Sequence, residues 1–224
     1  MKYPKAFIGE EREEFYRNAQ LTLEGRTVTN LIQAFMEKSN IPPRKWQLIQ
    51  LAPQSVDIPA MRVCKSYLED VVEQVKKGDG LFITGTPGNG KTSWTYKIAQ
   101  AYVWNVATSG NPSRMPVYFI NVPELFQSMK TMFGQEDSLK DLFYKIKESE
   151  LVIFDDIGAE NSTDWAKEQL YTLINSRYSN NKACIFTSNK PINALERRIA
   201  DRIKEMCTLV EFKETSSRGK PSNS

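Results

Sequence analysis

Eight residues in the first half of the chain constrain the fold more than any other part of the sequence. They read Gly85-Thr86-Pro87-Gly88-Asn89-Gly90-Lys91-Thr92 and match the pattern G-x-x-x-x-G-K-T. The apolar run 81–84 before them is typical of a buried strand, and residues 93–107 after them carry apolar side chains at helical spacing. A glycine-rich turn between a strand and a helix can surround a phosphate with backbone N–H groups at the positive end of the helix.

This loop predicts a nucleotide site in which Lys91 reaches the β- and γ-phosphates and the Thr92 hydroxyl binds Mg²⁺. An ordinary glycine-rich turn is the alternative, but the four fixed positions of the motif recur by chance in only about 1% of chains of this length. We therefore expect ATP and Mg²⁺ as cofactors. The predicted nucleotide-binding residues from the loop are Gly85, Thr86, Pro87, Gly88, Asn89, Gly90, Lys91, Thr92 and Ser93.

Short apolar runs alternate with helical segments along the rest of the chain, which predicts an α/β fold. Such alternation indicates a five-stranded parallel sheet with helices on both faces, and ligands bind at the carboxyl ends of its strands. The predicted strands are 81–84, 117–120, 151–154, 183–186 and 208–212. The predicted helices are 60–76, 93–107, 123–133, 138–148, one that follows 163–164, and 193–205.

Polar residues that follow two of these strands extend the predicted site. Asp155 and Asp156 come directly after 151–154, so Asp155 is expected to hold Mg²⁺ and Asp156 to orient or deprotonate a water molecule. Asn189 follows the next strand, where it could contact that water and the γ-phosphate. The alternatives are two acids that only end a strand and an Asx turn before Pro191.

Arginines on the late helix 193–205 are candidates for a contact between subunits. Arg198 and Arg202 are one turn apart and therefore share a face. An arginine supplied by a neighbouring subunit can stabilise charge on a phosphoryl group during its transfer. A solvated basic face is the alternative.

Residues 1–43 are predicted to form a short helical N-terminal extension, followed by an ATPase domain over 44–214 and a flexible tail over 215–224. After Thr27, a plausible helix cap, the residues Val28, Leu31, Ile32, Phe35 and Met36 form an apolar stripe. The stripe fits either docking onto the chain's own core or binding of a partner protein. The run 41–44, Ile-Pro-Pro-Arg, ends any helix and marks the boundary.

Composition excludes several classes of protein. The chain has no histidine, so the commonest metal ligand and general base are missing, and its three widely spaced cysteines argue against disulfides or a zinc module. A net charge of +3 is too small to indicate nucleic-acid binding by itself. No apolar run approaches the roughly 20 residues that cross a bilayer, and we expect a cytoplasmic protein.

Taken together, the runs GTPGNGKT, LVIFDDIGAE, FTSN and LERRIADRI, with VEF and a late Ser-x-Arg after them, resemble the DnaC/DnaI helicase-loader branch of the AAA+ ATPases over residues 40–218. The resemblance implies a P-loop NTPase of the AAA+ (ASCE) type. It also implies that Arg202 is the arginine finger with Arg198 second, and that Arg218 is a late sensor arginine that contacts the nucleotide. About 35 residues follow Asn189, too few for a full C-terminal helical lid.

The same resemblance implies a function. Such proteins assemble on ATP and deliver a hexameric DnaB-type replicative helicase onto single-stranded DNA, and their N-terminal part grips the helicase. A transposition helper ATPase of the IstB type and a nucleotide-switched adaptor with little hydrolysis are the alternatives. Candidate DNA contacts, for which core packing of the aromatic side chains is the alternative, are Phe126, Lys130, Phe133, Lys140, Tyr144, Lys145 and Lys147.

Overall fold

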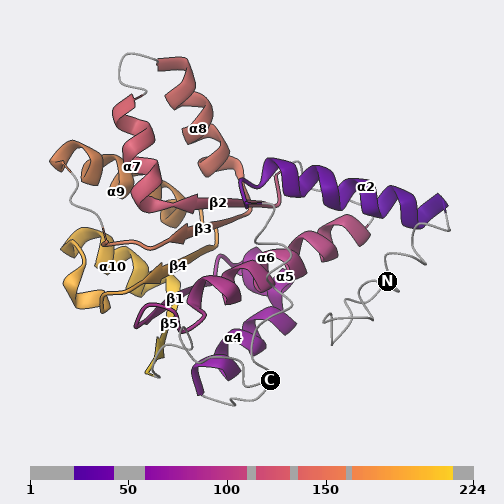
Figure 1. Cartoon of the computed structure of the whole chain (residues 1–224), viewed down its shortest axis with the longest axis horizontal. Coiled ribbons are helices and arrows are strands. Elements are labelled where there is room, and N and C mark those ends of the chain that lie inside the picture. Colours follow the sequence, from indigo (N-terminus) through magenta and orange to yellow (C-terminus); the bar gives the residue numbers. More distant parts are fainter. Residues whose placement is uncertain (1–22, 43–58, 110–114, 132–135, 160–162, 214–224) are drawn as a thin grey trace, which may run out of the picture.

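A computed structural model describes residues 23–42, 59–109, 115–131, 136–159 and 163–213, and its centre is one five-stranded sheet (Figure 1). All neighbouring strands are parallel, in the order β2-β3-β4-β1-β5. The predicted sheet is therefore confirmed. The strands are β1 (Gly80–Gly85), β2 (Val117–Asn121), β3 (Leu151–Asp155), β4 (Cys184–Ser188) and β5 (Cys207–Phe212).

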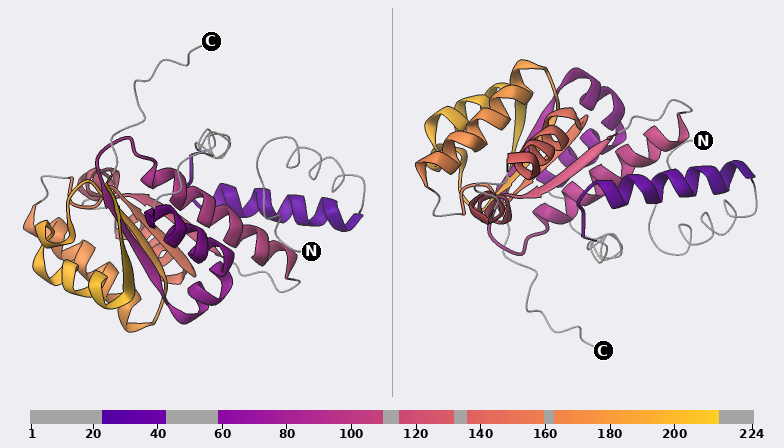
Figure 2. Two further views of the ribbon diagram at one scale, coloured as in Figure 1. Left: turned by 90° about the horizontal axis from the view of Figure 1, so that it is seen from below. Right: turned by 90° about the horizontal axis from the view of Figure 1, so that it is seen from above.

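Helices cover both faces of the sheet, as the two further views in Figure 2 show. Side chains alternate between faces, so Leu81 and Ile83 join one buried cluster while Phe82 joins the other. The first cluster is completed by α2 (Leu23–Lys38), α4 (Pro59–Glu69), α5 (Val71–Lys77) and α6 (Lys91–Thr108). The second is completed by α7 (Val122–Thr131), α8 (Glu136–Glu148), α9 (Asp164–Ser179) and α10 (Arg197–Met206). None of the helices described is both long and apolar enough to cross a membrane.

Two predicted helices differ from the observed ones. The segment 60–76 is divided at Asp70, where α4 has ended and α5 has yet to begin. The late helix was predicted to begin near Asn193, but that residue lies in a short 3₁₀ turn, η2 (Ile192–Ala194). The α-helix begins only after Glu196, whose carboxylate accepts hydrogen bonds from two backbone N–H groups of the first turn of α10.

The N-terminal helix α2 lies against α6 and belongs to the same core. Ile32 and Phe35 are each only 5% exposed and lie in the first cluster. Just after the helix, the Ser39 carbonyl accepts a hydrogen bond from the Phe119 backbone N–H at 2.7 Å, and the Asn40 side chain donates to the Phe119 carbonyl at 2.9 Å. The buried residues of the apolar stripe, Ile32 and Phe35, therefore dock onto the chain's own core, which is one of the two interpretations that the sequence allowed.

The start of α2 was predicted wrongly. The helix begins at Leu23, so Thr27 lies inside it rather than at its cap. Residues 43–58, which include the start of the predicted ATPase domain, lie outside the described residues, and so does the tail over 215–224.

Candidate active site at the carboxyl edge of the sheet

The order of the strands brings the predicted motifs together. β4 lies between β1 and β3, and each of these three strands ends in one part of the predicted site. The glycine-rich loop leaves β1, and α6 begins at Lys91 directly after Gly90. Because parallel strands end at the same edge, residues separated by about a hundred positions in sequence become neighbours.

The glycine-rich loop and the first acid are in direct contact. The Thr92 hydroxyl donates a hydrogen bond to Asp155 Oδ1 at 2.9 Å. Asp155 is buried, and this burial raises the pKa of its carboxyl group, although hydrogen bonds from the hydroxyls of Thr187 and Thr92 act in the opposite direction. A buried carboxylate beside a hydroxyl is the arrangement that the metal prediction requires.

Thr187 adds a contact that sequence reasoning missed. Its hydroxyl donates to Asp155 Oδ1 at 2.6 Å and accepts a hydrogen bond from the Asp156 backbone N–H at 2.9 Å. The available signal was its position, since Thr187 is the first polar residue after an apolar run that ends at the predicted site.

Lys91 lies at the centre of the loop, surrounded by oxygen atoms. Its side-chain ammonium donates to the carbonyl oxygens of Gly85 and Thr86, both at 2.8 Å. It also donates to the side-chain amide oxygens of Asn89 at 3.2 Å and Asn189 at 3.0 Å. The residue is 7% exposed, so the loop holds a buried cation whose contacts here are all oxygen acceptors.

Asn189 connects the loop with the second acid. While its Oδ1 accepts from Lys91, its Nδ2 donates to Asp156 Oδ1 at 2.7 Å. Asp156 itself has a left-handed backbone, with φ of 61°, where the chain leaves β3. The structure thus brings Lys91, Asn189 and Asp156 into one network, while their catalytic roles stay predictions.

The residues present fit a bound Mg²⁺ ion. Magnesium prefers oxygen ligands and is usually held by one or two carboxylates together with phosphate oxygens and water. Asp155 offers such a carboxylate, and Thr92 keeps lone pairs on its hydroxyl oxygen because it donates its proton to Asp155. The described part of the chain contains no group of three or more His, Cys, Asp or Glu residues that could hold a metal without a nucleotide.

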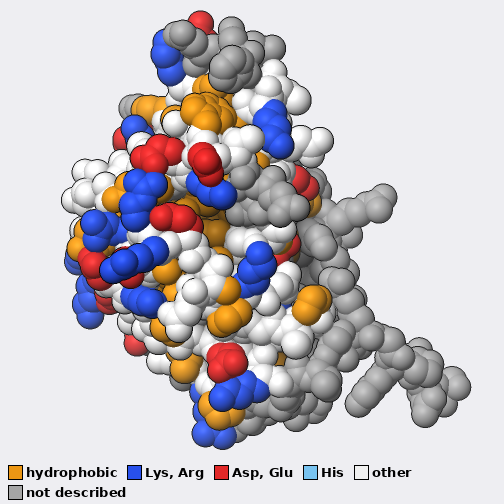
Figure 3. Space-filling view, turned by 90° about the vertical axis from the view of Figure 1, so that its left-hand side faces the viewer, with side chains coloured by type: hydrophobic (Ala, Val, Ile, Leu, Met, Phe, Trp, Pro, Cys, Tyr) orange, Lys and Arg blue, Asp and Glu red, His pale blue; other side chains and the backbone are white. Residues whose placement is uncertain are grey.

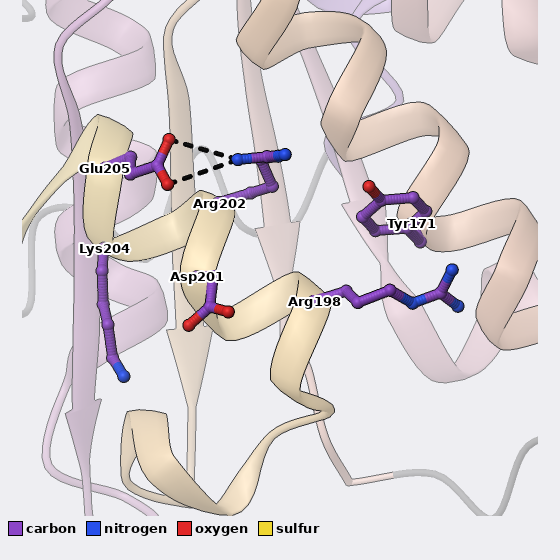
Figure 4. Close-up of a pocket in the computed structure, with 6 residues that line it drawn as sticks. All are labelled: Tyr171, Arg198, Asp201, Arg202, Lys204 and Glu205. Atoms are coloured by element: carbon purple, nitrogen blue, oxygen red, sulfur yellow. Dashed lines mark hydrogen bonds and ion pairs between the residues drawn. The ribbon is translucent and has the colours of Figure 1, made fainter.

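The two arginines of α10 form a set of contacts of their own with α9 and α10. Together with four neighbours they line a surface groove of about 370 Å³, in which Arg198 extends toward Tyr171 and Arg202 faces Glu205 (Figure 4). The Arg198 guanidinium lies 4.4 Å from the centre of the Tyr171 ring and forms an ion pair with Glu168 at 2.6 Å. Arg198 and Arg202 line the same groove, which confirms that they share a face of α10. The contacts given for them here are made with residues of α9 and α10.

Arg202 is held in a similar way two turns further along α9. Its guanidinium lies 4.6 Å from the centre of the Tyr178 ring and donates to the Asn175 side chain at 2.9 Å.

On the face of the molecule seen in Figure 3, basic and acidic side chains alternate, so no uniform basic surface forms there. Arg218 lies outside the described residues.

The candidate DNA contacts on α7 and α8 are of two kinds. Some are buried in the core, and others lie on the surface, where lysines pair with acidic side chains of the same helix. Phe126 is buried in the second cluster, as the core-packing alternative predicts, whereas Tyr144 is 59% exposed. Lys140 and Lys145 form ion pairs on their own helix, with Asp137 and Asp141 at 3.7 and 2.6 Å. Phe133 lies outside the described residues.

Known sequences resemble this chain over most of its length. The Bacillus subtilis (strain 168) phage-like element PBSX protein XkdC is 28% identical over 166 residues, which are 70% of this chain and 58% of XkdC. The replicative helicase loader DnaI of the same organism is 30% identical over 142 residues, which are 61% of this chain and 43% of DnaI. The chain thus spans about half the length of these relatives.

Solved structures share the fold. The crystal structure of the DnaC helicase loader matches with a TM-score of 0.63 at 22% identity, covering 77% of this chain and 100% of that one. The crystal structure of DnaI matches with a TM-score of 0.61 at 24% identity, covering 76% and 94%. The predicted AAA+ P-loop architecture and the resemblance to the DnaC/DnaI branch are therefore confirmed.

A family model described as "IstB-like ATP binding protein" matches residues 69–224, which include the glycine-rich loop and both acids. This match covers well over half of the chain and every part of the network around Lys91 and Asp155. The chain therefore belongs to the family of IstB-like ATP-binding proteins.

Proposed function

We propose that this ATP-binding protein is an Mg²⁺-dependent ATPase that loads a hexameric DnaB-type replicative helicase onto single-stranded DNA. The observation that carries the ATPase part is the hydrogen bond from Thr92 to Asp155, which joins the phosphate-loop motif to the carboxylate of the metal site. The observation that carries the loader part is the 30% identity to the helicase loader DnaI.

In this proposal, the residues of the loop exchange their present contacts for phosphate oxygens. Lys91 already lies among oxygen acceptors, and a triphosphate would supply stronger, charged ones in their place. Thr92 and Asp155 would hold Mg²⁺, which when bound neutralises charge on the β- and γ-phosphates.

Asp156 and Asn189 would prepare the attacking water. The amide of Asn189 fixes one oxygen of Asp156 and leaves the carboxylate able to accept a proton or a hydrogen bond from water. An aspartate is shorter than a glutamate, so we expect slow hydrolysis that is stimulated by assembly or DNA. Slow turnover suits a protein that acts as a nucleotide-dependent switch.

Assembly would complete the site. The α10 arginines contact only α9 and α10 in the interactions described above, so we propose that Arg202, or Arg198, acts on the nucleotide of a neighbouring copy. Homo-oligomers would then hydrolyse ATP faster than isolated protomers. Arg202→Ala should leave the affinity for ATP intact and lower only the stimulated rate.

A transposition helper ATPase is the second candidate, because the matching family model carries the name IstB-like. The two candidates differ in their partner, since a loader binds a helicase and a transposition helper binds duplex DNA with a transposase. Size-exclusion chromatography with a candidate helicase, with and without ATP, tests the choice. Co-elution that depends on ATP supports the loader, whereas binding to duplex DNA without helicase binding contradicts it.

The nucleotide site itself is tested by Lys91→Ala. Removing the buried ammonium should abolish binding and turnover of ATP, because its charge is the principal attraction for the phosphates. Lys65→Ala, which removes an exposed lysine of α4, is the matched control and should bind ATP like the original chain. Unchanged ATP affinity in Lys91→Ala would refute the site.

A further inference from the structure

One threonine hydroxyl lies between the two acids of the candidate site. The Thr187 side chain is 2% exposed, donates to Asp155 Oδ1 and accepts from the Asp156 backbone N–H. It thus contacts the carboxylate assigned to the metal and the backbone of the residue assigned to the water. No other described hydroxyl bonds to both acids.

The hydrogen bonds of Thr187 take the place of backbone pairing between β3 and β4 at the point where β3 ends. The β3–β4 ladder runs up to the pair Phe154 and Phe186, and beyond it the positive φ of Asp156 turns the chain out of the strand. There the Thr187 hydroxyl accepts the Asp156 N–H, and the Thr187 carbonyl accepts the Ile157 N–H at 2.8 Å. Thr187 therefore binds the backbone N–H groups of both residues that follow Asp155.

The chemistry of these groups fixes the direction of each hydrogen bond. A backbone N–H can only donate, so the Thr187 oxygen must accept from Asp156 and its own proton is directed to Asp155. Thr92 donates to the same Asp155 oxygen, Oδ1. Among the described residues, both side-chain hydrogen bonds to the Asp155 carboxylate are made to Oδ1 and none to Oδ2, so two hydroxyls orient the group through one oxygen.

We propose that Thr187 is a positioning residue that holds the Asp155 carboxylate in the orientation that binds the Mg²⁺ of the nucleotide complex. This inference rests on the proposed Mg²⁺-nucleotide site and extends it to a residue that contacts neither metal nor phosphate. Groups that orient a metal ligand typically change metal affinity by about 10–100-fold when they are removed. The effect of Thr187 should therefore appear in the dependence on Mg²⁺ and not in the contact of the loop with phosphate.

The experiment measures binding of a fluorescent ATP analogue as a function of Mg²⁺ concentration. Thr187→Val removes the hydroxyl and keeps the shape of the side chain, whereas Thr187→Ser keeps the hydroxyl. We expect the Mg²⁺ concentration at half-saturation to rise about 10–100-fold in Thr187→Val, with unchanged affinity in EDTA and recovery in Thr187→Ser. Thr108→Val, which removes a hydroxyl bonded only within α6, is the control and should match the original chain.

The outcomes separate this inference from the proposed function. An original chain that binds no nucleotide refutes the proposed function, whatever the variants do. An original chain that binds normally, with a Thr187→Val variant that keeps the same Mg²⁺ midpoint, refutes the positioning role. Equal impairment of the valine and serine variants also refutes it, because the serine retains the hydroxyl. Circular dichroism checks folding, and Thr187→Ala is the second hydroxyl-free variant if Thr187→Val does not fold.

Discussion

Phe35 on α2 provides the sharpest test of whether the N-terminal helix is part of the ATPase fold. The side chain is 5% exposed and lies in the same cluster as the core of the sheet. Beyond the helix, Ser39 and Asn40 bond to Phe119 on the edge strand β2. Replacing Phe35 with alanine should therefore weaken the attachment of α2 to the sheet, and with it the stability of the domain.

The expected magnitude follows from the area that Phe35 buries. An aromatic side chain buries about 150–250 Å², and at about 25 cal/mol per Å² this corresponds to roughly 4–6 kcal/mol. Alanine retains part of that area, and measured Phe→Ala losses in cores are about 3–5 kcal/mol. For a chain of this size each kcal/mol shifts Tm by about 2–4 °C, so Tm should fall by about 6–20 °C.

Differential scanning calorimetry of Phe35→Ala, compared with Gln33→Ala on the same helix, measures this effect. Gln33 is exposed, and its side-chain amide donates a hydrogen bond to Glu37 one turn further on, at 3.1 Å. Such a surface pair contributes about 0.2–0.5 kcal/mol, so the control should melt within about 2 °C of the original chain. Equal Tm values for Phe35→Ala and Gln33→Ala would refute the claim that α2 shares the core.

Three further predictions concern single residues in the core or at the candidate site. Arg177 is 1% exposed and donates to four backbone carbonyl oxygens, so Arg177→Met should lower the free energy of unfolding in urea by about 3–5 kcal/mol; a loss below about 1 kcal/mol contradicts this. Because burial raises the pKa of Asp155, its charge destabilises the ligand-free fold at neutral pH, and this penalty disappears as pH falls through that raised pKa. Asp155→Asn should thus raise Tm by about 2–4 °C for each kcal/mol regained at pH 7.5, and the gain should shrink as the pH is lowered through the raised pKa of Asp155, while a gain that grows toward acid contradicts the assignment. A Cβ on Gly85 would lie 2.3 Å from the Phe212 carbonyl oxygen, so Gly85→Ala should lower both Tm and nucleotide affinity, and a variant equal to the original chain in both would refute the contact.

The sheet and the main site residues could be predicted because their signals are local. The predicted strands are short, mainly apolar runs; Asp155 follows one of them directly, and Asn189 follows another after two polar residues. Once the strands are parallel, their carboxyl ends must share an edge, so these residues and Lys91 are predicted on one edge of the sheet. The strand order, with β4 between β1 and β3, is what brings them into contact.

Contacts between distant segments were not predictable in the same way. The apolar stripe of α2 fits a partner as well as the chain's own core, and the choice depends on distant segments, namely α6 and Phe119 of β2, which the pattern within α2 does not reveal. Arg177 lies on the buried face of α9 together with Leu170, Leu173 and Ile174. Its burial depends on backbone carbonyls of the α8–β3 connection and of Ala183, which no pattern within α9 reveals.

The arginines of α10 show what a local sequence pattern predicts and what it leaves open. Spacing alone places Arg198 and Arg202 on one face, since four residues make about one helical turn. On α9, two tyrosines seven residues apart each pack against one of these guanidinium groups: Tyr171 against that of Arg198 and Tyr178 against that of Arg202. Seven residues are about two turns, so both tyrosines lie on one face of α9. The two helices therefore present both guanidinium groups from one packed unit, and any partner that takes them must replace these tyrosine and carboxylate contacts with stronger ones.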